Sequence, residues 1–192
     1  MEKVFFATKF VGTHQNTSLR SIGLVSENNK TFYAEPTDYI DTRSIDPIQH
    51  NNIIDNLKFN DKSQYFNWNS ADANIELKDT SYIISIHLAD WFQDILCEYK
   101  QKSNQYIDFP IIELWTDQLS YNIILFNQLW GNTINIPKCI YHIPFDICTV
   151  FKLNGVDPNI DRKRFTNIRN GNINNALWNA KVIKKCYEKL II

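Results

Sequence analysis

Hydrophobic and polar residues alternate in the first part of the chain. Residues 4–8, 21–26 and 31–35 are short runs rich in β-branched and aromatic side chains, and this pattern predicts three strands. The polar segment at residues 27–30 separates the second run from the third and is typical of a turn. We therefore expect the chain to open with an antiparallel meander.

Apolar residues recur at helical spacing further along the chain. Thr80 can cap a helix in which apolar positions continue to Leu96. In a second predicted helix, residues 120–130, we expect Ile124, Leu125 and Leu129 to point inward and Gly131 to end the helix. Further elements are expected as a partly helical stretch at 41–57 starting near Pro47, strands at 111–115 and 139–142, and helices at 145–153 and 175–190.

Residues 59–79 have no clean period and contain many Asn and Asp residues. This composition predicts an irregular insert, which would be free to contact a partner. The alternative is that Tyr65, Phe66 and Trp68 fold back onto the core.

Length and composition indicate one domain spanning residues 1–192 with a sizeable core, because the chain is 44% hydrophobic and 14% aromatic. A meander followed by alternating helices and strands predicts an α/β fold, in which a mixed central sheet is flanked by helices in three layers. No apolar run approaches the length of a membrane span, so we expect no membrane partner.

Charge and cysteine usage limit the function further. The net charge is −1 and the pI is about 6.4, so nucleic-acid binding would need a local basic patch. The four cysteines form no CxxC pair and predict reduced thiols in a cytoplasmic protein. Zinc-ligand spacing, a glycine-rich phosphate loop and a G-x-S-x-G elbow are all absent from the sequence, so we expect no cofactor.

Four segments, in the same order, resemble a bacterial and phage group of small RNase T-like exoribonucleases in the DEDDh-type 3′–5′ exonuclease superfamily. The segments are FFATKFVGTHQNTSLRSIGLVSENNKTFYAE, WTDQLSYNIILFNQLWG, IPFDIC and NNALWNAKVIKKCYEKL. The section from about residue 40 to 105 matches least. The resemblance implies an RNase H-like fold and, in active relatives, carboxylates that hold two metal ions.

The catalytic residues that the resemblance implies are absent from this chain. The Asp and Glu of the family's first strand fall on Ala7 and Lys9, the middle Asp falls on Asn122, and the last His and Asp fall on Asn174 and Asn179. Asparagine is neutral and a poor ligand for hard cations on its own. Lysine at position 9 would place a positive charge where a metal would lie. The resemblance therefore predicts a pseudoenzyme, with no catalysis and no metal.

Two other carboxylates, Asp117 and Asp146, could replace the missing ones. The simpler interpretation is that Asp146 caps the helix after it and that Asp117 caps the helix near Ser120.

The altered cleft could still bind a phosphate. Lys9 would hold it directly, and Asn122, Asn174 and Asn179 would donate amide hydrogens. The alternative is a decayed cleft in which asparagine was tolerated.

Other candidate contacts to nucleic acid surround these positions. They are the basic residues Arg162, Lys163, Arg164 and Arg169, together with His14 as a phosphate contact and Trp178 as a base-stacking surface. Each has a plainer interpretation: a solvated basic loop, an exposed loop histidine and an inward core tryptophan.

Two functions remain open. In the first, the protein binds RNA, single-stranded DNA or a nucleotide without hydrolysis. In the second, it is a protein-interaction module that inhibits or regulates a partner, as a phage or mobile-element anti-defence protein would. RNase T-like relatives are often dimers, so the resemblance also implies a homodimer.

Overall fold

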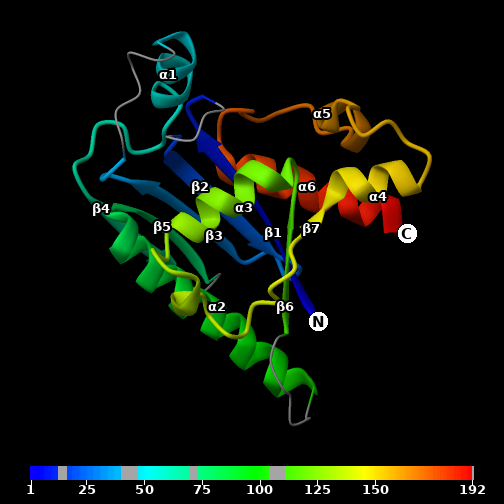
Figure 1. Ribbon diagram of the computed structural model, residues 1–192, viewed down its shortest axis with the longest axis horizontal. Coiled ribbons are helices and arrows are strands. Elements are labelled where there is room, and N and C mark those ends of the chain that lie inside the picture. The colour runs from blue at the N-terminus through cyan, green and yellow to red at the C-terminus, as the bar shows by residue number, and fades with distance from the viewer. Residues whose placement is uncertain (13–16, 40–46, 70–72, 104–110, 192) are drawn as a thin grey trace.

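The computed structural model describes residues 1–12, 17–39, 47–69, 73–103 and 111–191. It is an α/β structure with a seven-stranded mixed sheet and helices on both faces (Figure 1). The strands are β1 Glu2–Phe10, β2 Leu19–Ser26, β3 Thr31–Pro36, β4 Tyr65–Asn69, β5 Asn74–Asp79, β6 Ile112–Thr116 and β7 Phe145–Asp146. The α-helices are α1 Pro47–Ile54, α2 Ser81–Ser103, α3 Leu119–Gln128, α4 Ile147–Leu153, α5 Arg162–Thr166 and α6 Ala176–Ile191.

The sheet has the strand order β4-β5-β3-β2-β1-β6-β7. Strands β1, β2 and β3 pair antiparallel in sequence, which confirms the predicted meander. On one side β6 and then β7 extend the sheet parallel to β1. On the other side β5 runs parallel to β3, and β4 returns antiparallel to β5.

Side chains of β1 alternate between two apolar cores, one on each face of the sheet. Val4 and Phe6 belong to a core that α2 and α3 cover. Phe5 and Ala7 belong to a core that α4 and α6 cover. Figure 1 shows α3 crossing in front of the sheet and α6 lying behind it. Because the side-chain period of a strand is two, one alternating run accounts for both layers.

Helix α6 approaches the sheet closely at Gly23 of β2. A Cβ atom there would overlap the backbone of Ala176 and Leu177, in the first turn of α6. Gly23 pairs in register with Ala7 of β1. Small residues at these two positions therefore let the start of α6 lie directly over β1 and β2.

The predicted irregular insert at residues 59–79 is wrong, because this segment contains β4 and β5. Only Ile75 and Leu77 of β5 are buried in the core under α2. Two buried positions are too few to give the sequence a recognisable strand pattern.

The three aromatic residues of β4 differ in their burial. Tyr65 folds back and stacks on Phe59, whereas Phe66 and Trp68 are 52% and 57% exposed.

Three local expectations also need correction. The segment at 145–153 begins with the two-residue strand β7, and helix α4 starts only at Ile147. Residues 139–142 contribute an isolated bridge from Ile140 to Ile112 rather than a strand. Ile124 is 55% exposed, although its neighbour Leu125 is fully buried as expected.

A helix long and apolar enough to cross a membrane does not occur in the part of the chain that the structure describes.

Candidate ligand-binding cleft

A cleft of about 780 Å³ opens where β1 ends and where α3, α5 and α6 begin. Its lining includes all five positions at which the resemblance places catalytic residues: Ala7, Lys9, Asn122, Asn174 and Asn179. These residues come from three segments that are far apart in sequence. The fold therefore brings the five positions to one cleft, although none of them carries a carboxylate or an imidazole.

Lys9 is the unusual charge in this cleft. It lies near the end of β1, opposite Ser21 of β2, and its side chain is half-buried. Burial lowers the pKa of the Lys9 ammonium to about 8. Among the residues that the structure describes, no group accepts a hydrogen bond from Lys9 or forms an ion pair with it. A partly desolvated ammonium without a counter-ion is unfavourable by itself and is relieved by a bound anion.

Asn122 is buried, and its side-chain amide links α3 to β1 and to the end of β6. Its Oδ1 accepts hydrogen bonds from the backbone N–H and the hydroxyl of Thr8 in β1. Its Nδ2 donates to the Thr116 hydroxyl, at 3.0 Å, and to the Asp117 carbonyl. Both amide hydrogens are thus used inside the protein. The expectation that Asn122 would donate to a phosphate is therefore wrong.

Asn174 and Asn179 lie at the start of α6, on the wall of the cleft. The backbone N–H of Asn174 donates to the side chain of Asn172, at 2.9 Å. The Nδ2 of Asn179 donates to the carbonyl of Ile173, at 3.0 Å. Within the described chain, the side-chain amide of Asn174 and the Oδ1 of Asn179 have no hydrogen-bond partner. These two residues keep polar groups that a ligand can reach.

Trp178 and Lys163 form another part of the wall. The Lys163 ammonium lies 4.9 Å from the centre of the Trp178 ring, and the indole N–H donates to the Asn170 carbonyl at 3.2 Å. A Cβ atom at Gly171, whose φ is 143°, would overlap the indole. Trp178 also packs against the core beneath α6, so it is both a partly buried core residue and a lining residue.

Arg162 is held by groups inside the protein. Its Nε and Nη2 donate to the two carboxylate oxygens of Asp117, at 3.0 and 3.2 Å, and its Nη1 donates to the Ile160 carbonyl. The guanidinium also lies 4.6 Å from the centre of the Phe151 ring. Arg162 lines the cleft, but most of its N–H donors already bond to protein groups, namely Asp117, the Ile160 carbonyl and the Cys148 sulfur.

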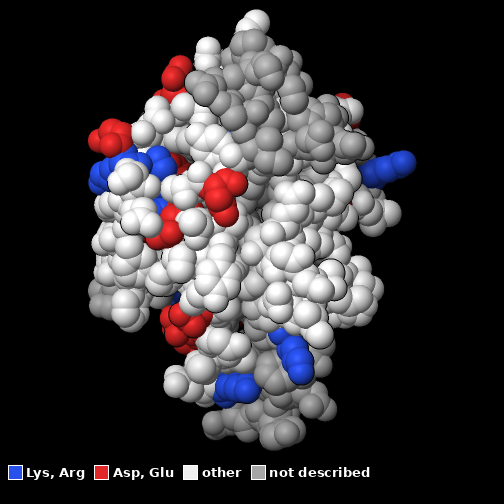
Figure 2. Space-filling view, turned by 60° about the vertical axis from the view of Figure 1, so that its left-hand side comes forward, with Lys and Arg blue, Asp and Glu red and all other residues white. Residues whose placement is uncertain are grey.

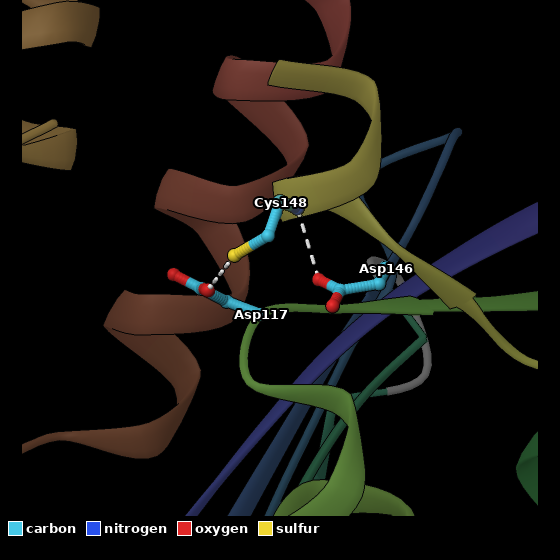
Figure 3. A group of neighbouring side chains, drawn as sticks. All are labelled: Asp117, Asp146 and Cys148. Atoms are coloured by element: carbon cyan, nitrogen blue, oxygen red, sulfur yellow. Dashed lines mark hydrogen bonds between the residues drawn. The ribbon is translucent and has the colours of Figure 1, made fainter. Parts of the chain in front are cut away.

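Asp117 and Asp146 do come together, with Cys148 between them (Figure 3). One potential ligand atom from each lies within 4.8 Å of the others. However, Asp117 is paired with Arg162 and accepts a hydrogen bond from the Cys148 thiol. Asp146 caps α4 by accepting from the backbone N–H of Cys148, at 2.9 Å, as the sequence predicted. The cluster is therefore satisfied by protein groups and does not offer a free set of metal ligands.

The cap predicted for Asp117 is wrong. Helix α3 begins after Gln118, which has a left-handed backbone conformation and makes no side-chain cap. Asp117 is turned toward Arg162 and Cys148 instead. Burial and the Asp117 carboxylate raise the pKa of the Cys148 thiol to about 12, so this cysteine stays protonated and unreactive.

The remaining candidates lie elsewhere. Arg164 and Arg169 are exposed and do not belong to the cleft lining, and His14 lies outside the described residues. The sequence analysis missed Asn52 and Ile53 of α1, which complete the cleft wall. Nothing in their local pattern marks them, because only the tertiary fold brings α1 to the end of β1.

Lys9, Arg162 and Lys163 contribute positive charge to the cleft lining, and Asp117 and Asp161 contribute negative charge. Both carboxylates have partners, since Asp117 pairs with Arg162 and Asp161 accepts from the Arg164 backbone N–H to cap α5. The described lining therefore leaves Lys9 and Lys163 without a carboxylate partner. Such a cleft favours a small anion.

The chain matches no known protein-family model, and no curated protein is significantly similar to it in sequence.

Proposed function

We propose that this chain is a catalytically inactive protein with an RNase H-like exonuclease fold of the RNase T-like group. It binds nucleic acid or a nucleotide in the cleft without hydrolysing it. The meander β1–β2–β3, extended by parallel β6 and β7 and covered by helices on both faces, supports this fold. The convergence of Ala7, Asn122 and Asn179 on one cleft supports the ancestry.

The observation that carries the proposal is the environment of Lys9. Its ammonium is partly desolvated, lines the cleft and has no anionic partner among the described residues. A phosphate beside it would supply the missing counter-ion and a charge-assisted hydrogen bond. Asn174 at the start of α6 and Lys163 beside Trp178 also line the cleft and could make further contacts.

Hydrolysis by two metal ions is not expected in this cleft. That mechanism needs several carboxylates that converge on the ions. In the described lining, the carboxylates are Asp117 and Asp161, and both are held by protein partners. Lys9 would also repel a divalent cation from the position that a metal would take.

The test is a set of dissociation constants for adenosine monophosphate, short single-stranded RNA and short single-stranded DNA, measured by calorimetry at constant salt. We expect Lys9→Glu to weaken binding by about a hundredfold, because it replaces an attraction with a repulsion. The matched control is Lys152→Glu, an exposed charge reversal in α4 away from the lining, which should change affinity by less than about twofold. Absence of binding, or equal effects of the two reversals, would exclude the phosphate-binding cleft.

Incubating the protein with the same RNA and Mg²⁺ or Mn²⁺ tests the proposal that the cleft does not hydrolyse nucleic acid. We expect no release of nucleotides from the 3′ end. Metal-dependent release of nucleotides by the parent protein would overturn the proposal that the cleft is inactive.

The second candidate function is a protein-interaction module. It is favoured by the internal use of Asn122 and Arg162, which removes two expected ligand contacts from the cleft. A pull-down from the native host, with and without nuclease treatment, separates the two functions. Recovery of one protein after nuclease treatment, together with no measurable nucleotide affinity, would favour the module.

A further inference from the structure

Strand β4 forms one edge of the sheet, and in the described part of the chain no strand pairs with its outer side. Its sequence is Tyr65-Phe66-Asn67-Trp68-Asn69, without a charged residue or a proline. The outer side of an edge strand carries N–H and C=O groups that can pair with another strand, and natural proteins usually protect such edges with charges, prolines or bulges. This edge has none of those protections within the strand.

The side chains of β4 fall on two faces. Asn67 lies between Phe66 and Trp68, and these two aromatic residues pair in register with Leu77 and Ile75, which face the core under α2. Phe66 and Trp68 therefore share the α2 side of the sheet. Phe66 stacks on His87 of α2, with ring centres 4.6 Å apart.

Figure 2 brings forward the left-hand side of Figure 1, where β4 and α2 lie. Uncharged side chains cover much of the middle of this face, with acidic and basic groups to their left and basic groups below them. About half of the surface of each β4 aromatic side chain on this side remains exposed, 52% for Phe66 and 57% for Trp68. Exposed aromatic side chains on a strand whose outer side has no described partner strand indicate an interaction surface.

We propose that β4 pairs antiparallel with β4 of a second copy of this chain, about a two-fold axis at Asn67. The strand is self-complementary in this register. Phe66 of each copy lies opposite Trp68 of the other, and Asn67 lies opposite its own copy. Cross-strand aromatic pairs are among the most favourable pairs in sheets. The pairing brings four aromatic side chains together on the α2 side and joins the two sheets into one.

The second copy fits this edge better than a charged segment does. The strand contains no charged side chain, so two copies meet without like-charge repulsion, and a charged partner would find no complementary group within the strand. A two-fold contact also uses the same patch on both copies, which is the usual arrangement in homodimers. This inference does not depend on what the cleft binds.

The experiment measures the association state of the full chain by sedimentation equilibrium over a range of concentrations. The variant Asn67→Lys places two ammonium groups opposite each other at the axis, and we expect it to weaken association by about a hundredfold. Circular dichroism checks that the variant is folded, which we expect because Asn67 is exposed at the edge. The control is Asn60→Lys, an exposed position in the turn before β4, which should associate as the parent does.

Cysteine cross-linking tests the register independently, in a Cys97→Ser background because Cys97 is exposed. Residues directly opposite in an antiparallel pair have Cα atoms about 5 Å apart, so Asn67→Cys should form a disulfide between copies. Asn69→Cys should not, because the two Asn69 positions are offset by four residues, or about 13 Å.

A chain that is monomeric at all concentrations overturns the proposal, even if it binds an extended peptide from another protein along β4. A dimer that persists unchanged in Asn67→Lys, or that cross-links at position 69 and not at 67, overturns it as well.

Discussion

The Oδ1 of Asn122 accepts hydrogen bonds from both the backbone N–H and the hydroxyl of Thr8, and this pair fastens α3 to β1. The same side chain donates to the Thr116 hydroxyl and to the Asp117 carbonyl at the end of β6. A carboxylate could accept the two hydrogen bonds from Thr8. It could not donate to the Asp117 carbonyl, which only accepts. The structure around position 122 is thus suited to an amide.

We predict that Asn122→Asp destabilises the protein by about 3 kcal/mol at neutral pH, because it buries a charge and sets it against a carbonyl oxygen. The pKa of the new carboxyl should be raised in the folded state relative to the unfolded state. The folded protein then binds more protons, so the stability of the variant falls relative to the parent as pH rises from about 4. Urea denaturation at about pH 5 and pH 8 measures this difference.

The control for this variant is Asn60→Asp, the same change at an exposed turn position. It should alter stability by less than about 0.5 kcal/mol at either pH. Equal stabilities of Asn122→Asp and the parent at pH 8 would mean that the hydrogen bonds from the Asn122 amide contribute little.

Lys9 should lower the stability of the ligand-free protein. Its pKa is reduced from 10.5 to about 8 by burial, so the unfolded chain binds more protons between these values. The free energy of unfolding therefore rises with pH between about 8 and 10.5. Below about pH 8 the buried, charged ammonium of Lys9 destabilises the folded protein to its full extent. We predict that Lys9→Met raises the free energy of unfolding by about 2 kcal/mol at pH 7.

Denaturant titrations of Lys9→Met and the parent at about pH 7 and pH 10 check this prediction. The advantage of the variant should shrink at the higher pH, where Lys9 is neutral in the folded parent. Comparing the two proteins at both pH values removes the effect of the other titrating groups, since the parent and Lys9→Met both contain them. A Lys9→Met protein that is less stable than the parent at pH 7 would indicate a stabilising partner for the ammonium.

Ligand affinity should follow the protonation of the same residue. In the proposed cleft it is the ammonium form of Lys9 that would bind phosphate, and its pKa in the free protein is about 8. Affinity for adenosine monophosphate should be nearly constant between about pH 7 and 7.5 and should fall by about tenfold per pH unit well above 8. Calorimetry of the parent and of Lys9→Met tests this, because the variant should lack the fall. A similar fall in both proteins would assign the titration to another group.

The sequence predicted elements with a clear period and missed those whose partners are distant. The three strands of the meander, α2 and α6 follow from local pattern and lie where expected. Strands β4 and β5 were missed because only Ile75 and Leu77 are buried, and pairing with β3 supplies the rest of their stabilisation.

The same difference applies to the cleft. The five positions selected from the expected resemblance all line the cleft. The sequence could not show that the side chain of Asn122 hydrogen-bonds to Thr8 and Asp117, or that the guanidinium of Arg162 pairs with Asp117. These bonds join residues from separate elements of the fold. The sequence also could not show that Lys9 lacks a described partner. The sequence showed which residue types line the cleft, but it did not show which of their side chains are free to bind a ligand.

Gly171 should control the position of Trp178. A methyl group at Gly171 would overlap the indole, and the φ of 143° is unfavourable for other residues. We predict that Gly171→Ala destabilises the protein by about 3 kcal/mol and displaces Trp178 from the cleft wall. Gly131→Ala is the control, because Gly131 also has a positive φ but open space around it, and it should cost only about 1 kcal/mol. Thermal denaturation gives both values, and equal losses would mean that the overlap is relieved easily.

Lys184 on α6 has a structural role that its neighbour Lys185 does not share. Its ammonium is buried and donates to the Glu27 carbonyl, at 2.8 Å, and to the side chain of Asn29 in the turn between β2 and β3. Lys185 is exposed on the same helix. The second half of α6 is therefore fixed to the meander by Lys184, as its first turn is by contact with Gly23.

We predict that Lys184→Met destabilises the protein by about 2 kcal/mol, because it leaves two acceptors at the turn without their donor. Lys185→Met removes the same charge from the same helix and should change stability by less than about 0.5 kcal/mol. Urea denaturation of the two variants separates hydrogen bonding from net charge. If both variants lost equal stability, the effect would come from the charge of α6 and not from its connection to the turn.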